Sequence, residues 1–154
     1  KFRTDVAMMD KLGFDINMDR LSEPERQFCR DAVKTYNRLS PIIQEGDQYR
    51  LVSPYGSNHA AVMYMTPDKN HGVLFAYDMY PRKHVERLYP IQLNGLDPQR
   101  KYKLVEINKM DDGSLVRPFV DEGKVYTGEY LMKVGVQAFS DLQERSRVIE
   151  IIAQ

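Results

Sequence analysis

The apolar residues recur with helical spacing up to about residue 45, and after that point they run in short blocks separated by turn residues. The first pattern predicts one long amphipathic helix. Its start is marked by Ser22-Glu23-Pro24-Glu25, a capping box with a proline in the first turn. We expect Pro41 to distort or end the last turn. The apolar stripe of this helix comprises Phe28, Ala32, Val33, Tyr36, Leu39 and Ile43.

A second, shorter helix is predicted before the long one. Thr4 or Asp5 can cap it, it runs through Leu12, and Gly13 stands where a left-handed residue often ends a helix. Phe14 and Ile16 follow as apolar anchors. This helix is too short to be stable alone, so the opening of the chain needs something to pack against.

The junction between the two patterns lies at Leu39–Pro54, with Gly46 at the change from helix to strand. We expect Gly46 to end the long helix with positive φ, a conformation that costs little only for Gly or Asn. A β-branched residue at Gly46 should therefore destabilise the junction.

The second pattern predicts short strands joined by turns rich in Gly, Pro, Asn and Asp, which is typical of an antiparallel β-sandwich. Thr127 is expected to cap a single helical turn within this region. The fold class is therefore mainly β, with one short and one long helix before an antiparallel β-sandwich. The predicted strands are Tyr49–Ser53, Ala60–Thr66, Gly72–Tyr80, Leu88–Leu93, Lys101–Asn108, Leu115–Phe119, Val134–Phe139 and Arg147–Ile152.

Composition narrows the classes of partner. The 22 basic and 22 acidic residues balance, so no overall charge attracts the chain to nucleic acid or to an anionic membrane. No apolar run reaches the ~18 residues of a membrane-spanning helix, and no signal peptide is visible. The single Cys29 has no partner for a disulfide or a metal site and is expected to be a packing residue. The opening on Lys1 suggests a piece of a larger protein, so the compartment stays undetermined.

Catalytic chemistry is not indicated by the acidic residues. The strand-borne acids Asp78, Glu106, Glu129 and Glu150 lie far apart in the sequence, and strand alternation normally turns such residues toward solvent. A hydrolytic carboxylate pair made from two of them is therefore a minor alternative. We assign no catalytic residue.

Metal and phosphate sites are equally unsupported. His59 and His71 lie in or beside turns, and His84 lies in a basic loop, without metal-ligand spacing. The turns at residues 68–70 and 111–113 lack the later glutamate of an EF-hand, so we interpret them as hairpin turns. A row of cations on the long helix is more typical of a solvated face than of a phosphate site: Arg26, Arg30, Lys34 and Arg38. No cofactor is implied.

Tyrosine is abundant, with 10 residues, and its ring can fill a core or stack on a sugar. At the strand positions Tyr49, Tyr64, Tyr77 and Tyr102 we favour the core. A sugar-binding module with exposed tyrosines stays open as an alternative, and so does an autonomous hydrolase.

Several motifs occur in a fixed order along the chain: KFRTDVAMM at residues 1–9, KLGFDI at 11–16, GDQYRL at 46–51, GLDP at 95–98, Tyr102, EIN at 106–108, TGEYLM at 127–132 and Gly135. Together they resemble the C-terminal portion of α-galactosidases of glycoside hydrolase family 36, the melibiase-like enzymes. The resemblance covers essentially the whole chain. One departure is Asp10, where the family phrase usually has Gly; we expect the acid to alter local packing or solvent exposure near the edge of the barrel.

The resemblance implies a parent enzyme with a (β/α)₈ barrel that removes terminal α-linked galactose with retention of configuration, using two Asp residues. In the family both Asp motifs lie upstream of the quoted residues, so this chain is expected to be non-catalytic. Residues 1–46 would be the last piece of the barrel, and residues 47–154 the C-terminal β-sandwich. The implied partners are the parent barrel and, for the whole enzyme, galactosides; substrate-binding residues in this chain stay unknown.

The apolar stripe of the long helix would face barrel neighbours in the parent. Burial of each large side chain contributes ~1.5–3 kcal/mol, so the stripe favours another cover when those neighbours are absent. We expect it to pack on the β domain of its own chain or on a second copy as a homo-oligomer.

Overall fold

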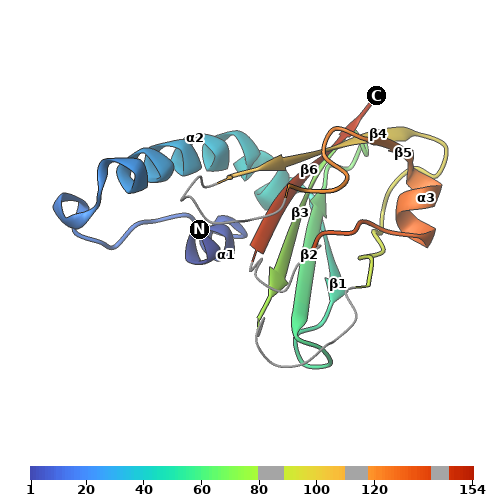
Figure 1. The fold of residues 1–154 in the computed structure, drawn as a ribbon. Helices are drawn as coiled ribbons and strands as arrows, with labels where there is room; N and C mark the ends of the chain where they lie inside the picture. Colours follow the sequence, from blue (N-terminus) through green and yellow to red (C-terminus); the bar gives the residue numbers. More distant parts are fainter. Residues whose placement is uncertain (80–88, 110–117, 140–145) are drawn as a thin grey trace.

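The computed structural model describes residues 1–79, 89–109, 118–139 and 146–154. Its strands form one six-stranded antiparallel sheet in the order β1-β2-β3-β6-β4-β5 (Figure 1). The last strand, β6, therefore lies between β3 and β4. The elements are α1 (Phe2–Met8), a 3₁₀ turn (Met18–Arg20), α2 (Glu23–Glu45), β1 (Asp47–Val52), β2 (His59–Met65), β3 (His71–Asp78), β4 (Lys101–Ile107), β5 (Val125–Thr127), α3 (Gly128–Lys133) and β6 (Ser146–Ala153).

Both faces of the sheet are covered, α1 and α2 lying on one side and α3 on the other (Figure 1). The helix-side core includes Met8 of α1 and Leu39 of α2 against Phe75 of β3. The opposite core includes Leu131 of α3 against Leu104 of β4. Two apolar layers separated by an antiparallel sheet confirm the predicted fold class, a mainly β domain preceded by a short and a long helix.

Helix α2 begins where the capping box predicts. The Ser22 N–H donates to Glu25 Oε2 at 2.8 Å, and Pro24 lies in the first turn. Pro41 does not end the helix, because α2 continues to Glu45. Pro41 cannot donate to the Asn37 carbonyl four residues earlier; the Ser40 hydroxyl donates to that oxygen instead, at 3.2 Å.

The apolar stripe of α2 packs on the sheet along only part of its length. Leu39 and Ile43 are buried against the sheet, whereas Val33 is 39% exposed. The prediction that the stripe packs on the β domain of its own chain is thus confirmed for the C-terminal half of the helix. The N-terminal half projects beyond the sheet (Figure 1).

Helix α1 differs from the prediction at both ends. It is capped by Lys1 and ends at Met8, so Thr4 and Asp5 lie inside it and are buried. Gly13 is not left-handed; the described glycines with positive φ are Gly95, Gly123 and Gly135. The reason is tertiary, because the Asp5 carboxylate accepts hydrogen bonds from the sheet side, including one of 2.6 Å from the Ser146 hydroxyl.

The prediction of positive φ at Gly46 is wrong. Gly46 has φ −79° and ψ 161°, an extended conformation that leads directly into β1. Glycine is needed there for another reason, a close approach of backbone. An added Cβ atom would lie 2.3 Å from the Ile42 carbonyl oxygen and 2.8 Å from that of Met65.

The predicted strands corresponding to β1, β2, β3, β4 and β6 agree with the structure to within about two residues at each end. The predicted strands at 88–93 and 134–139 are wrong, since their described residues meet only in an isolated bridge between Ile91 and Val136. Most of the predicted strand at 115–119 lies outside the described residues. The short β5 was not predicted. The helical turn capped by Thr127 is confirmed, with the Tyr130 N–H donating to Thr127 Oγ1 at 3.2 Å.

Candidate functional site

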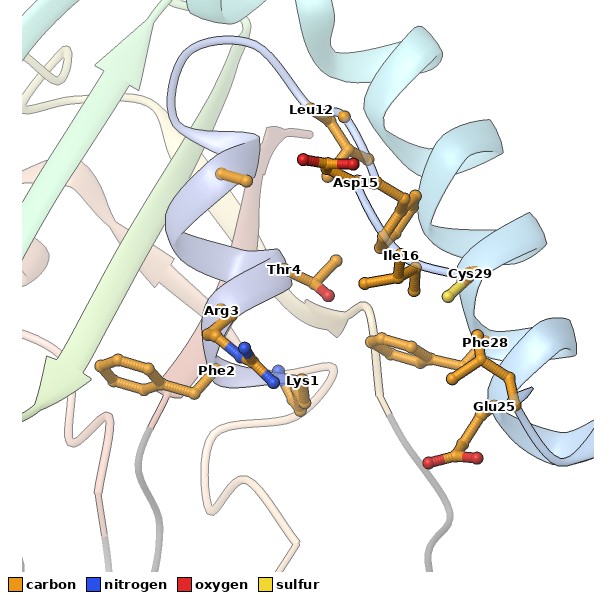
Figure 2. Close-up of a pocket in the computed structure, with 14 residues that line it drawn as sticks. Lys1, Phe2, Arg3, Thr4, Leu12, Asp15, Ile16, Glu25, Phe28 and Cys29 are labelled. Carbon is orange, nitrogen blue, oxygen red and sulfur yellow. The ribbon is translucent and has the colours of Figure 1, made fainter. Parts of the chain in front are cut away.

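An open pocket of about 520 Å³ lies between α1, the segment at residues 12–16 and the first half of α2. Figure 2 shows Phe28 reaching from α2 toward α1, with Ile16 and Cys29 beside it. The wall of the pocket is largely apolar, and charged groups such as Arg3 and Glu25 also line it. The shape fits the docking of another apolar element better than the orientation of a small polar substrate.

More exposed apolar side chains lie in the same part of the chain. Four of the ten exposed large apolar side chains in the described part of the chain lie in residues 1–46, and Ile16 among them also lines the pocket. The sequence indicated Phe14 and Ile16 as anchors but could not show how the chain forms a pocket with α2. These exposed residues are Val6 at 41%, Ile16 at 47%, Met18 at 39% and Val33 at 39%.

The four strand-region acids do not face solvent as a group. Asp78 and Glu150 are buried at 2% and 4% exposure, and Glu106 has a side chain 8% exposed. Only Glu129 has the expected exposure; it lies in α3 and pairs with Lys133 at 2.6 Å. The alternation argument fails because both faces of this sheet are covered. Glu106, Glu129 and Glu150 are each paired with a different cation, so these three supply no geometry for a carboxylate pair.

Glu150 forms the centre of a charged cluster on the helix side of β6. Arg38 of α2 donates to both of its oxygens, one of the two bonds being 2.9 Å, and His71 of β3 lies 2.8 Å from Oε1. Burial raises the pKa of the Glu150 carboxyl, but the bonds from His71 and Arg38 outweigh burial and lower the pKa to about 2. The carboxylate is ionised and satisfied, as a structural ion pair requires.

A second buried ion pair lies on the other face of the sheet. Arg147 of β6 donates to Glu106 of β4 at 2.6 Å, and its guanidinium lies 5.6 Å from the centre of the Phe119 ring. Burial raises the pKa of Glu106, against the opposing influence of Arg147. Arg147 is 2% exposed, so the pair is part of the interior and not an open reactive site.

The histidines are not simply exposed loop residues. His71 is held by Glu150, and the ring of His59 stacks on Phe139 with centroids 5.9 Å apart. His84 lies outside the described residues, as does the turn at 111–113. Within the described ranges, no group of three or more His, Cys, Asp or Glu side chains could hold a metal ion. The described helices also include none long and apolar enough to cross a membrane.

The basic row on α2 is mostly a solvated face, as predicted. Arg26 and Arg30 pair with Glu23, at 3.0 and 2.6 Å, and Lys34 is 3.5 Å from Asp31. Arg38 is the exception because its partner is on the sheet. Cys29 is a buried packing residue, again as predicted.

Three of the four strand tyrosines singled out in the sequence are buried in the core, as predicted. Tyr64, Tyr77 and Tyr102 are 6%, 3% and 0% exposed, and each hydroxyl donates to a backbone carbonyl. Tyr49 packs against the core from an edge strand. A separate pair, Tyr126 and Tyr130, is stacked with ring centroids 4.7 Å apart at 8°.

Tyr126 and Tyr130 do not form the open platform that a sugar-binding module requires. Each ring covers one face of the other. Tyr130 is 41% exposed, and Tyr126 is half-buried. The Tyr126 hydroxyl donates to Asp121 at 2.8 Å. Burial, together with that bond, raises the pKa of Tyr126 to about 12, so the hydroxyl stays a neutral donor.

Comparison with known proteins gives a consistent result. Residues 59–151 match the model of the glycosyl hydrolase family 36 C-terminal domain. The chain is 33% identical over 150 residues to a probable alpha-galactosidase C of Aspergillus terreus, which covers 96% of this chain and 18% of that protein. It is 27% identical over 136 residues to alpha-galactosidase AgaA of Geobacillus stearothermophilus, or 88% of this chain and 16% of that one.

A solved structure has the same fold. The crystal structure of the family 36 alpha-galactosidase AgaB of Geobacillus stearothermophilus superposes with a TM-score of 0.79 at 27% identity, covering 99% of this chain and 19% of that chain. The chain therefore spans less than a fifth of the length of these relatives. Because the family model matches more than half of its residues, the chain belongs to glycosyl hydrolase family 36 and carries the C-terminal domain of that family.

Proposed function

We propose that this chain is the non-catalytic C-terminal part of a retaining α-galactosidase, and that the whole enzyme hydrolyses terminal α-linked galactose in oligosaccharides. The proposal rests on the alpha-galactosidase names of the relatives and on their much greater length. The two catalytic Asp residues would lie in a barrel outside residues 1–154, with its carboxylates close enough for direct attack on the sugar.

In this proposal residues 1–46 complete the catalytic (β/α)₈ barrel and residues 47–154 form the β-sandwich. The observation that carries it is the apolar pocket of about 520 Å³ between α1 and α2. The family-model match begins only at residue 59, so the two helices precede the recognised C-terminal domain. The preceding helices of the barrel are the occupant that we assign to the pocket, and a second copy of the chain is the competing occupant.

The chain itself should not turn over substrate. Glu106, Glu129 and Glu150 are each paired with a cation, which leaves them as structural groups. A purified preparation of residues 1–154 should release no chromophore from a chromogenic α-galactoside above a mock purification. Reproducible turnover that copurifies with the chain and disappears in a Glu106→Gln variant would contradict the non-catalytic role.

A chimera tests the assignment to the barrel. The segment of a family 36 α-galactosidase that matches residues 1–154 is replaced by this chain, and the control enzyme ends before that segment. We expect the chimera to be folded and active on an α-galactoside, and the truncated control to be inactive or insoluble. A Phe28→Asp substitution in the pocket should destabilise the chimera.

The pocket between α1 and α2 also makes a prediction for the isolated chain. If barrel helices are the natural occupant, the chain should be monomeric at micromolar concentration and bind an apolar dye at the pocket. A stable dimer that Phe28→Asp dissociates would instead favour the second copy as the occupant.

The competing sugar-binding function would have to use the exposed Tyr130, although its stacking on Tyr126 leaves only one ring face open. Titration with galactosides, followed by amide chemical shifts, distinguishes the two functions. Shifts centred on Tyr130 that saturate at millimolar sugar and are lost in Tyr130→Ala would support sugar binding. Unchanged spectra at that concentration would remove it.

A further inference from the structure

A continuous series of polar contacts crosses from the helix side of the sheet to the α3 side around the turn between β2 and β3. It begins at the ion pair of Arg38 with Glu150, which in turn binds His71 at the start of β3. The contacts that follow connect elements on both faces of the sheet. We call the residues Arg38, Glu150, His71, Thr66, Asp68, Asn70 and Arg100 the turn relay.

The first half of the turn relay passes through the turn itself. The backbone N–H of His71 donates to Thr66 Oγ1 at 3.1 Å, and the Thr66 hydroxyl donates to Asp68 Oδ1 at 2.6 Å. Asp68 also accepts from the backbone N–H and the side-chain amide of Asn70, at 3.0 and 2.6 Å. These bonds hold Lys69 at φ 59°, a conformation that non-glycine residues adopt only when their surroundings fix it.

The second half leads from the turn to α3. One nitrogen of Arg100 donates to the carbonyls of Asp68 and Lys69, at 3.0 and 3.2 Å, and to Asn70 Oδ1 at 2.6 Å. The backbone carbonyl of Arg100 accepts from the Gly128 N–H at 2.8 Å, at the start of α3. Gly128 in turn lies so close to Asp97 that an added Cβ atom would be 2.0 Å from its carbonyl oxygen.

We propose that the turn relay couples the docking of α2 on the sheet to the ordering of α3 on the opposite face. When Arg38 leaves Glu150, the carboxylate no longer holds the His71 ring in one position. The turn between β2 and β3, to which Arg100 donates hydrogen bonds, is then less constrained. In a chain of hydrogen bonds each bond fixes the geometry of the next. Here the Glu150 end is buried, whereas the bonds around Asp68 and Arg100 are exposed. If the proposed function holds, contact of α2 with the barrel changes the ordering of α3. The coupling itself does not depend on that function.

The test is amide hydrogen exchange in the full 154-residue chain, read at Gly128 and Glu129. Their N–H groups donate to Arg100 and Pro98, so exchange there reports the start of α3. Arg38→Gln should speed their exchange at least about threefold, the lower range of coupling between groups that share a network. The amide of Phe75, which is 0% exposed in β3, reports global unfolding and is subtracted.

A matched variant and a relay-breaking variant make the test specific. Lys34→Gln removes an exposed α2 cation that pairs with Asp31, and it should leave Gly128 and Glu129 at the wild-type rate. In a Thr66→Val background, which interrupts the relay, Arg38→Gln should add no further increase. By reciprocity, Arg100→Gln should speed exchange at Leu39 in α2.

Two results would overturn the proposal. One is faster exchange in α2 of Arg38→Gln with unchanged rates at Gly128 and Glu129. The other is an Arg38→Gln effect of the same size with and without Thr66. If Arg38→Gln does not fold, Arg38→Lys keeps the charge but loses the two-pronged geometry, and the same comparison is made with it.

Discussion

Arg38 of α2 and Glu150 of β6 are 112 residues apart in the sequence, yet the guanidinium group binds both oxygens of the carboxylate across the helix–sheet interface. The Glu150 side chain is 5% exposed. Such a pair does not by itself prove net stabilisation, but the loss of one partner leaves a buried charge uncompensated. The interface thus depends on Glu150 being ionised.

The first prediction concerns pH. The pKa of Glu150 is lowered from 4.5 to about 2 on folding, so the unfolded chain binds more protons between these values and stability falls as the pH falls through that window. The contribution, up to about 3 kcal/mol, is present above pH ~4.5 and lost by pH ~2. Urea unfolding at several pH values should show a shallower acid slope for Glu150→Gln. Glu129→Gln removes a carboxyl whose pKa is lowered by the exposed Lys133, and because solvent screens that pair it should change the slope much less.

The second prediction compares two glycines. Gly46→Ala should destabilise the chain by ~2 kcal/mol or more, because its Cβ would strike the Ile42 and Met65 carbonyls. Gly13→Ala should be neutral or slightly stabilising, since nothing lies within 4 Å of an added Cβ there. The two midpoints of thermal unfolding should therefore differ by several degrees. Equal midpoints would show that the backbone at residue 46 relaxes freely.

The third prediction concerns the two halves of α2. Leu39 is 0% exposed, so Leu39→Ala should cost ~2–5 kcal/mol in the isolated chain, whereas Val33→Ala should change stability by less than ~0.5 kcal/mol. In the chimera with a catalytic barrel, Val33→Ala should become destabilising, because the proposed barrel covers it. The comparison of unfolding free energies in the two settings tests the domain assignment. An unchanged effect of Val33→Ala in the chimera would contradict barrel contact at this position.

The fourth prediction concerns Arg147 and Glu106. Arg147→Met alone should cost ~3–5 kcal/mol because it leaves the buried Glu106 without its cation. Adding Glu106→Leu should recover part of that loss, since two apolar side chains need no charge compensation. A double-mutant cycle by urea unfolding measures the coupling. Strictly additive losses would show that the pair contributes little beyond its packing.

Features encoded by neighbouring residues could be predicted from the sequence. The start of α2 at Ser22 and the cap of α3 at Thr127 both depend on contacts within three residues. The apolar blocks bounded by turn residues likewise located β2 and β3, whereas the segments meeting at Ile91 and Val136 had the composition of strands without partners to extend the pairing.

Features that depend on distant residues could not be predicted in the same way. Gly46 was correctly singled out, but its reason lies in the Met65 carbonyl of a neighbouring strand. Glu150 was expected in solvent because the sequence does not show that α2 covers that face. The pocket is a similar case, because its walls come from α1, residues 12–16 and α2, and their spacing is a property of the folded chain.

The central place of β6 also has a consequence for the order in which the protein folds during synthesis. β6 separates β3 from β4, so the β1–β3 and β4–β5 groups cannot join into one sheet until residues 146–153 have left the ribosome. Until then both groups present an unpaired edge, a form prone to wrong association. Nascent chains stalled before residue 146 should therefore be sensitive to protease, and the sheet should become resistant only after β6 emerges.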